Sequence, residues 1–250
     1  VCSSDLIAKF VARASTGIIC ASEHSRNFFL GLGVSSNKVF LARNATSDYA
    51  IATDIQDDFT DSVSKKYFND SLPTVLYLGR VVQYKGLDVL IKAFAEVEKQ
   101  TRAKLVVVGE GDFLEYCKNL AKELGIQNIF FVGSATTAEA KVFYHLSSIF
   151  VLPARFTKSS NVVSEAWGFT INEALSAGLP VITTEAAAAS EIISNGVNGF
   201  VVKSEDVAEL SYKIITILNN QKQFAQHSRK VFQAINPSSQ AQQFIFALSI

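Results

Sequence analysis

Residues 73–109 read PTVLYLGRVVQYKGLDVLIKAFAEVEKQTRAKLVVVG. The apolar runs at 74–78 and 104–108 have the length of buried strands, and each ends at a glycine. Between them, residues 87–100 form a helical pattern whose apolar face consists of Leu87, Leu90, Ile91, Phe94 and Val97. A strand, a helix and a strand in this order predict one crossover of a parallel sheet.

The same alternation extends in both directions. Downstream, the pattern predicts strands at 128–132, 149–152, 181–184 and 199–202 and helices at 113–124, 137–146 and 170–177. It also predicts a helix between the last two strands, and further helices from Asp206 that break near Pro237. Upstream, short strands at 16–21 and 39–42 enclose a helix that Ser22 can cap and Gly33 can end. The predicted fold is α/β, a doubly wound, Rossmann-like parallel sheet, with functional residues just after the strands.

Composition narrows the function classes. Hydrophobic residues make up 48% of the 250 residues and charged residues 18%, which allows a sizeable core. The 23 basic and 23 acidic residues cancel, so no basic field indicates a nucleic-acid partner. Three widely spaced cysteines favour a reducing compartment, and no signal peptide or membrane-spanning run is present, so we expect a cytoplasmic location. Because the sequence contains no methionine, we expect a fragment or a processed form.

Two cations follow the first strand of the quoted stretch. Arg80 and Lys85 lie in a loop bounded by Gly79 and Gly86. An arginine fork and a lysine point charge that face one crevice would suit a diphosphate. The alternative is a pair of solvated loop cations.

Two glutamates flank a predicted helix start farther along the chain. Glu165 precedes Gly168, and Glu173 lies about one turn into the helix that follows. The backbone N–H groups near Gly168, Phe169 and Thr170 form a natural anion site, and the Glu173 carboxylate can accept two ribose hydroxyls. The alternative for Glu173 is an ordinary acid that the helix dipole favours.

Other motifs carry less information. The loop Gly109-Glu110-Gly111 partly matches a dinucleotide fingerprint, but Leu114 stands where the third glycine would be, so a tight turn is the better interpretation. The histidines are isolated, and the acidic residues between 54 and 61 are interpreted as a solvated linker. We therefore predict no metal site.

In order and spacing, these motifs resemble the retaining glycosyltransferases of the GT-B fold, specifically glycosyltransferase family 4. The pattern consists of Gly79-Arg80 with Lys85-Gly86, then the two glutamates, then residues 174–182, ALSAGLPVI. The resemblance covers roughly residues 72–219. It implies a C-terminal nucleotide-sugar-binding domain at 72–235 that follows a linker at 51–71. Residues 1–50 would be the end of an incomplete N-terminal domain, and residues 236–250 a helix that returns toward it.

The resemblance also implies an activity, which is transfer of a sugar from a nucleoside-diphosphate sugar to a glycan or lipid-linked acceptor, without a cofactor or metal. Arg80 and Lys85 would bind the diphosphate, Glu165 the donor sugar and Glu173 the ribose. Gly133, Gly168, Phe169 and Thr170 would complete the nucleotide site. The stretch 155–164 is longer and more polar than in the family pattern, so we expect it to alter the donor-sugar pocket or the interdomain contacts.

The implied N-terminal domain could also provide a peripheral membrane contact. With that domain incomplete, we expect the fragment alone to be inactive. Two other functions remain open at this stage. One is a nucleotide-binding or regulatory module without catalysis, and the other is a dehydrogenase that binds NAD.

Overall fold

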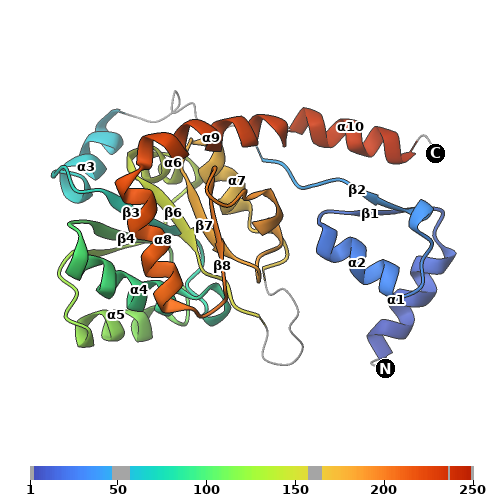
Figure 1. The fold of residues 1–250 in the computed structure, drawn as a ribbon, viewed down its shortest axis with the longest axis horizontal. Coiled ribbons are helices and arrows are strands. Elements are labelled where there is room, and N and C mark those ends of the chain that lie inside the picture. Colours follow the sequence, from blue (N-terminus) through green and yellow to red (C-terminus); the bar gives the residue numbers. More distant parts are fainter. Residues whose placement is uncertain (1–2, 47–56, 157–164, 236, 249–250) are drawn as a thin grey trace. The chain divides into compact units, whose positions relative to one another are not determined.

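The computed structural model describes residues 3–46, 57–156, 165–235 and 237–248. It divides the chain into two compact units. The first unit comprises residues 1–47 and 234–250, and the second comprises residues 48–233. Figure 1 shows the elements of each. None of the helices in the described ranges combines the length and the apolar composition needed to cross a membrane.

The second unit is built on a six-stranded sheet with the strand order β5-β4-β3-β6-β7-β8, in which all neighbours are parallel. This confirms the predicted fold class. The strands are β3 (Thr74–Leu78), β4 (Lys104–Val108), β5 (Ile129–Gly133), β6 (Ile149–Leu152), β7 (Val181–Thr184) and β8 (Gly199–Val202).

Helices cover both faces of this sheet. The chain moves outward from β3 to β4 and β5, then returns to β6 and moves outward on the other side. Right-handed crossovers in opposite directions place their helices on opposite faces. One face carries α4 (Leu87–Gln100), α5 (Leu114–Glu123) and α8 (Val207–Asn219), while α3 (Asp57–Tyr67) packs on α6 (Thr137–Leu146) on the other. The five apolar residues that predicted α4 are fully buried.

One predicted element is wrong. The segment between β7 and β8 contains no α-helix but only the 3-10 turn η3 (Ala188–Ile192). The amides of Ala188 and Ala189 donate to the carbonyls of Glu165 and Trp167, so they are not available for an α-helical ladder. Sequence reasoning also missed α1 (Ser3–Ala14).

The first unit contains a two-stranded parallel sheet, β1 (Ile18–Cys20) and β2 (Val39–Leu41), joined by α2 (Glu23–Gly31) and the 3-10 turn η1 (Ser36–Lys38). Ser22 caps α2, as predicted, in a capping box with Ser25. The buried hydrophobic cluster of the first unit is small and consists of Ala12, Cys20, Val34 and Val39.

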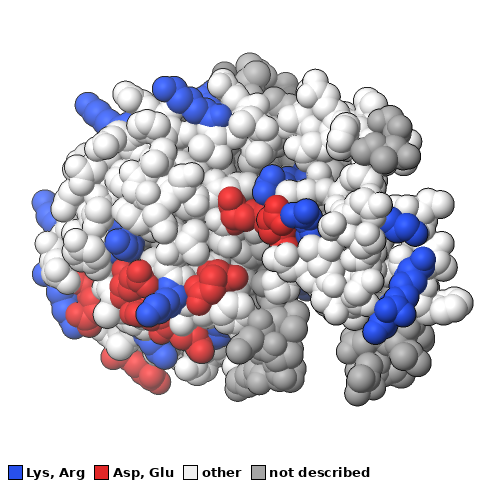
Figure 2. All heavy atoms as spheres, turned by 45° about the vertical axis from the view of Figure 1, so that its right-hand side comes forward, with Lys and Arg blue, Asp and Glu red and all other residues white. Residues whose placement is uncertain are grey.

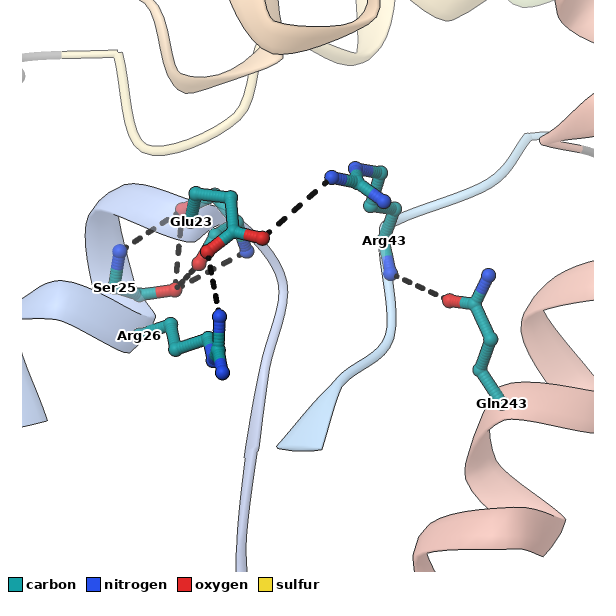
Figure 3. A network of polar contacts seen from close by, with 6 residues as sticks. Glu23, Ser25, Arg26, Arg43 and Gln243 are labelled. Carbon is teal, nitrogen blue, oxygen red and sulfur yellow. Dashed lines mark hydrogen bonds and ion pairs between the residues drawn. The ribbon is translucent and has the colours of Figure 1, made fainter. Parts of the chain in front are cut away.

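The helix α10 (Pro237–Leu248) belongs to this first unit and is attached through polar groups (Figure 3). The Arg43 amide donates to the side-chain oxygen Oε1 of Gln243 at 3.0 Å, and the Arg43 guanidinium lies 3.9 Å from Glu23. Glu23 also pairs with Arg26 at 3.2 Å. Two helices and the segment after β2 are thereby joined by a single chain of contacts.

Glycines allow the loops after β3 and β4 to touch. Gly109 has φ +141°, and a Cβ atom there would lie 1.9 Å from the carbonyl oxygen of Gly79. The Gly79 amide donates to Val108, and the Gly109 amide donates to Gly133. The glycine loop predicted as a tight turn therefore also serves close backbone approach.

We predict that Gly109→Ala lowers the free energy of unfolding by about 3 kcal/mol or more, because the added methyl group overlaps a backbone carbonyl. The matched control is Gly125→Ala. Gly125 also has positive φ (+69°), but no atom lies within 4 Å of the place that an added methyl group would occupy. That change should cost only about 1 kcal/mol. Urea denaturation of both variants measures the difference, and equal losses would contradict the assigned contact.

Candidate functional site

The sheet has one topological switch point. The strand β3 pairs with β4 on one side and with β6 on the other, and the chain leaves these two central strands in opposite directions. In an open parallel sheet, ligands bind outside the carboxyl ends of the strands at such a point. The segments that begin there are residues 79–86, after β3, and the segment that starts at Pro153, after β6.

An ion pair joins these two loops. The 3-10 turn η2 (Gln83–Lys85) ends in Lys85, whose Nζ lies 3.0 Å from Glu165 Oε2. The side chains are only 12% and 15% exposed, so the pair is shielded from much of the solvent. Glu165 is held by its own backbone, which donates to Ala186 and accepts from Ala188. Two residues that the sequence assigned to one site are therefore in contact.

The helix α7 (Phe169–Ser176) begins beside this pair. Its N-cap is Gly168, at φ +99°, and no described side chain caps it. A Cβ atom on Gly168 would lie 3.5 Å from Glu165 Cγ. The Thr170 hydroxyl is buried and has no hydrogen-bond partner among the described residues, while Phe169 is half exposed. The uncapped start of α7 thus lies next to the ion pair, an arrangement that suits an anion.

Arg80 is exposed, in the loop after β3 that also carries Lys85. Its Nη2 donates to the Tyr84 hydroxyl at 2.9 Å, and its carbonyl accepts from the Tyr77 hydroxyl at 2.9 Å. Burial, with smaller contributions from nearby ionisable groups, raises the pKa of Tyr77, so this hydroxyl stays a donor. The backbone of Arg80 is therefore fixed, while its guanidinium remains at the surface.

Glu173 projects from the second turn of α7 and is half-buried. Tyr144, a fully buried residue of α6, donates its hydroxyl to Glu173 Oε2 at 2.8 Å. Gly133 lies farther away along the sheet, at the end of β5, where its carbonyl accepts from Gly109. The structure thus brings Lys85, Glu165 and the start of α7 together. Glu173 is held by a hydrogen bond from Tyr144 of another helix, α6.

The glycine loop after β4 does not match a dinucleotide site. A Cβ atom on Gly111 would lie 2.2 Å from the carbonyl oxygen of Val81. This glycine therefore accommodates the neighbouring loop of the protein. Gly111 is thus explained by the close approach of the Val81 backbone, and it requires no dinucleotide.

The 23 basic and 23 acidic residues of the chain cancel in formal charge. On the face drawn in Figure 2, acidic and basic side chains lie next to one another. Among the described residues, no group of three or more His, Cys, Asp and Glu side chains could hold a metal ion. Cys117 is a buried free thiol, and burial raises its pKa to about 12, so it is a poor ligand and nucleophile at neutral pH.

Sequence reasoning missed Tyr77 and Tyr144, which support the site. Tyr77 lies inside an apolar strand and Tyr144 inside a predicted helix, so neither was singled out as a site residue. The available signal was chemical, since a buried tyrosine hydroxyl requires a partner. Trp167 illustrates the same rule, because its indole N–H donates to Asn172 at 2.9 Å in the core.

Comparison with protein families gives this site a context. Residues 58–233 match the family model described as glycosyl transferases group 1. The match covers more than half of the chain and includes both site loops and α7. The chain therefore belongs to the group 1 glycosyl transferases.

Individual relatives agree with this family. A GDP-mannose-dependent alpha-(1-6)-phosphatidylinositol monomannoside mannosyltransferase of Mycobacterium tuberculosis is 31% identical over 156 residues, which are 62% of this chain and 40% of the relative. An alpha-monoglucosyldiacylglycerol synthase of Streptococcus pneumoniae is 30% identical over 169 residues, 66% of this chain and 36% of the relative. The matched regions thus span about two fifths of these relatives' length.

Solved structures share the fold. A glycosyltransferase from Rickettsia africae superposes with a TM-score of 0.82 at 20% identity, over 98% of this chain and 66% of that one. HepE of Anabaena, solved in complex with UDP and glucose, superposes with a TM-score of 0.80 at 19% identity, over 99% of this chain and 67% of that one. Both agree with the GT-B architecture.

We predict that Tyr144→Phe lowers the free energy of unfolding by about 1 kcal/mol, because it removes a hydrogen bond to a partly solvated carboxylate. Tyr212→Phe is the control, since Tyr212 is 64% exposed on α8. The midpoint of urea denaturation should fall for the first variant only. A loss of the same size in both would mean that the Tyr144 hydroxyl does not support Glu173.

Proposed function

We propose that this protein transfers a sugar from a nucleoside-diphosphate sugar to a glycan or lipid acceptor, with retention of configuration and without a metal ion. The observation that carries the proposal is the Lys85–Glu165 pair at the sheet's switch point, beside the uncapped start of α7. Family membership supports the reaction class. Support for retention comes from the resemblance in motif order.

The leaving group of such a reaction is a nucleoside diphosphate, which gains negative charge as the bond to the sugar breaks. Lys85, Arg80 and the first-turn amides of α7 are the groups that can stabilise this charge. The two side chains would supply positive charge and the amides partial positive charge, which is the role that a metal ion plays in other transferases. We infer that these groups suffice for metal-independent departure of the diphosphate.

The ion pair gives Glu165 a second task. In the arrangement described, its carboxylate neutralises Lys85. A diphosphate would compete for the lysine, and the carboxylate oxygens of Glu165 could then accept hydroxyls of the donor sugar. Glu173, whose carboxylate accepts from Tyr144, would accept the ribose hydroxyls. The two glutamates thus have different parts of the donor within reach.

The acceptor is proposed from the relatives. The names of two of them contain lipid-linked sugars, a phosphatidylinositol monomannoside and a monoglucosyldiacylglycerol. We propose an acceptor of that kind, a glycan or a lipid-linked sugar.

We predict that Arg80→Ala and Lys85→Ala each weaken binding of a nucleoside diphosphate by about 1.5–3 kcal/mol, the range for hydrogen bonds that involve a charged group. Calorimetric titration of the chain with UDP and with GDP measures the effect. Lys92→Ala is the matched control, because Lys92 is an exposed lysine of α4. Unchanged affinity in both site variants would refute the diphosphate assignment.

Substitution of the two glutamates should have different effects on nucleotide binding and on sugar transfer. Glu173→Gln should weaken binding of plain UDP or GDP, because both contain the ribose. Glu165→Gln should leave that affinity unchanged or slightly higher, since it removes the carboxylate that competes for Lys85, yet it should lower sugar transfer in the whole protein. Equal losses of nucleotide affinity in the two variants would show that this division of roles is wrong.

A further inference from the structure

The segment after β6 lies directly against the loop that carries Lys85. Gly86 has φ +71°, and a Cβ atom there would lie 1.9 Å from the carbonyl oxygen of Pro153. Two residues farther on, the Arg155 amide donates to the Tyr84 carbonyl at 2.8 Å. The two loops are therefore in backbone contact on both sides of Lys85 in the sequence.

The Arg155 side chain extends this contact to three elements. Its Nη1 donates to the Gln83 carbonyl at 3.0 Å, its Nη2 donates to the Asp88 carboxylate at the start of α4, and its Nε lies 3.0 Å from Glu205. One guanidinium thus joins the turn η2, the helix α4 and the turn between β8 and α8. Such a fork uses the fixed donor geometry that lysine lacks.

The two carboxylates differ in their surroundings. Asp88 is 4% exposed, so its charge depends on Arg155 for compensation. Glu205 is largely exposed, although its backbone is held at φ +66°, which is uncommon for a residue with a side chain. Burial lowers the pKa of Arg155, but hydrogen bonding and the charges of Asp88 and Glu205 outweigh this and raise it. Arg155 is therefore a permanent cation whose charge is already balanced within the protein.

We propose that Arg155 is a positioning residue of the donor site, which acts through Lys85 and does not touch the donor. The inference rests on the proposed function. Its guanidinium bond to the Gln83 carbonyl holds the backbone shortly before Lys85, and its bond to the Asp88 carboxylate holds the start of α4 shortly after it. In contrast to Arg80, its guanidinium is engaged by two carboxylates and so has no surplus charge for a diphosphate.

The test is a double-mutant cycle on the affinity for UDP and GDP, measured by calorimetry on the 250-residue chain. Arg155→Ala should weaken binding about tenfold in the wild-type background, because a misplaced Lys85 loses its contact with the diphosphate. In the Lys85→Ala background the same change should have less than about a threefold effect, because the residue through which it acts is absent. Arg102→Ala, an exposed arginine before β4, should have no effect in either background.

Removal of Arg155 leaves Asp88 buried and uncompensated, so Arg155→Ala combined with Asp88→Asn is titrated as well. The loss of affinity should persist in this variant even where its melting temperature recovers. Recovery of affinity together with stability would overturn the proposal, as would an equal loss in both backgrounds of the cycle.

The outcomes also separate this inference from the function on which it rests. If the wild-type chain binds neither UDP nor GDP, both fall. If it binds, and Lys85→Ala weakens binding while Arg155→Ala does not, only the positioning role falls.

Discussion

Backbone-to-backbone contact between the loops at the carboxyl ends of β3, β4 and β6 is the constraint on which the site depends. Glycines at 79, 86, 109 and 111 make these contacts, and at three of them a side chain would overlap a carbonyl oxygen of the neighbouring loop. Because the loops touch directly, their positions follow from the register of the strands. The sheet therefore also fixes the positions of Lys85 and Glu165, the cation and the carboxylate that meet at the switch point.

A second principle is that several charged side chains of the site and its supports are paired within the protein. Lys85 pairs with Glu165, Tyr144 donates to Glu173, and Arg155 bridges Asp88 and Glu205. Such pairs lower the cost of holding charges in a partly buried place, and they fix side-chain directions. Less ordering is then required on binding, and groups that are already oriented can act on developing charge without reorganisation.

The local patterns of the sequence predicted this sheet well, for a physical reason. Strands buried on both faces are short apolar runs, and glycines mark the ends of many of them, so β6, β7 and β8 were predicted with the bounds that the structure has. The helix α4 was equally clear, because its apolar face repeats at helical spacing. The meeting of Lys85 with Glu165 followed from one topological rule, since both residues lie in loops that follow strands.

The remaining contacts could not be predicted in this way. Tyr144 and Glu173 are 29 residues apart, and Arg155 and Asp88 are 67 apart, so no local pattern relates them. The wrong prediction of a helix before β8 has a similar cause. Two amides of this segment donate to the carbonyls of Glu165 and Trp167, which lie in a different segment of the chain. Long-range hydrogen bonds thus decide both the supports of the site and the local structure that periodicity misjudged.

The placement of the site within the chain separates two tasks. All residues assigned to the donor lie between Arg80 and Glu173, inside the second unit, and their supports Tyr77, Tyr144 and Arg155 lie in the same unit. The first unit has its own small buried cluster and its own polar connection to α10. Every contact described above that fixes the donor residues is therefore made within one compact body. It follows that, under the proposed function, donor affinity depends on the integrity of that one body.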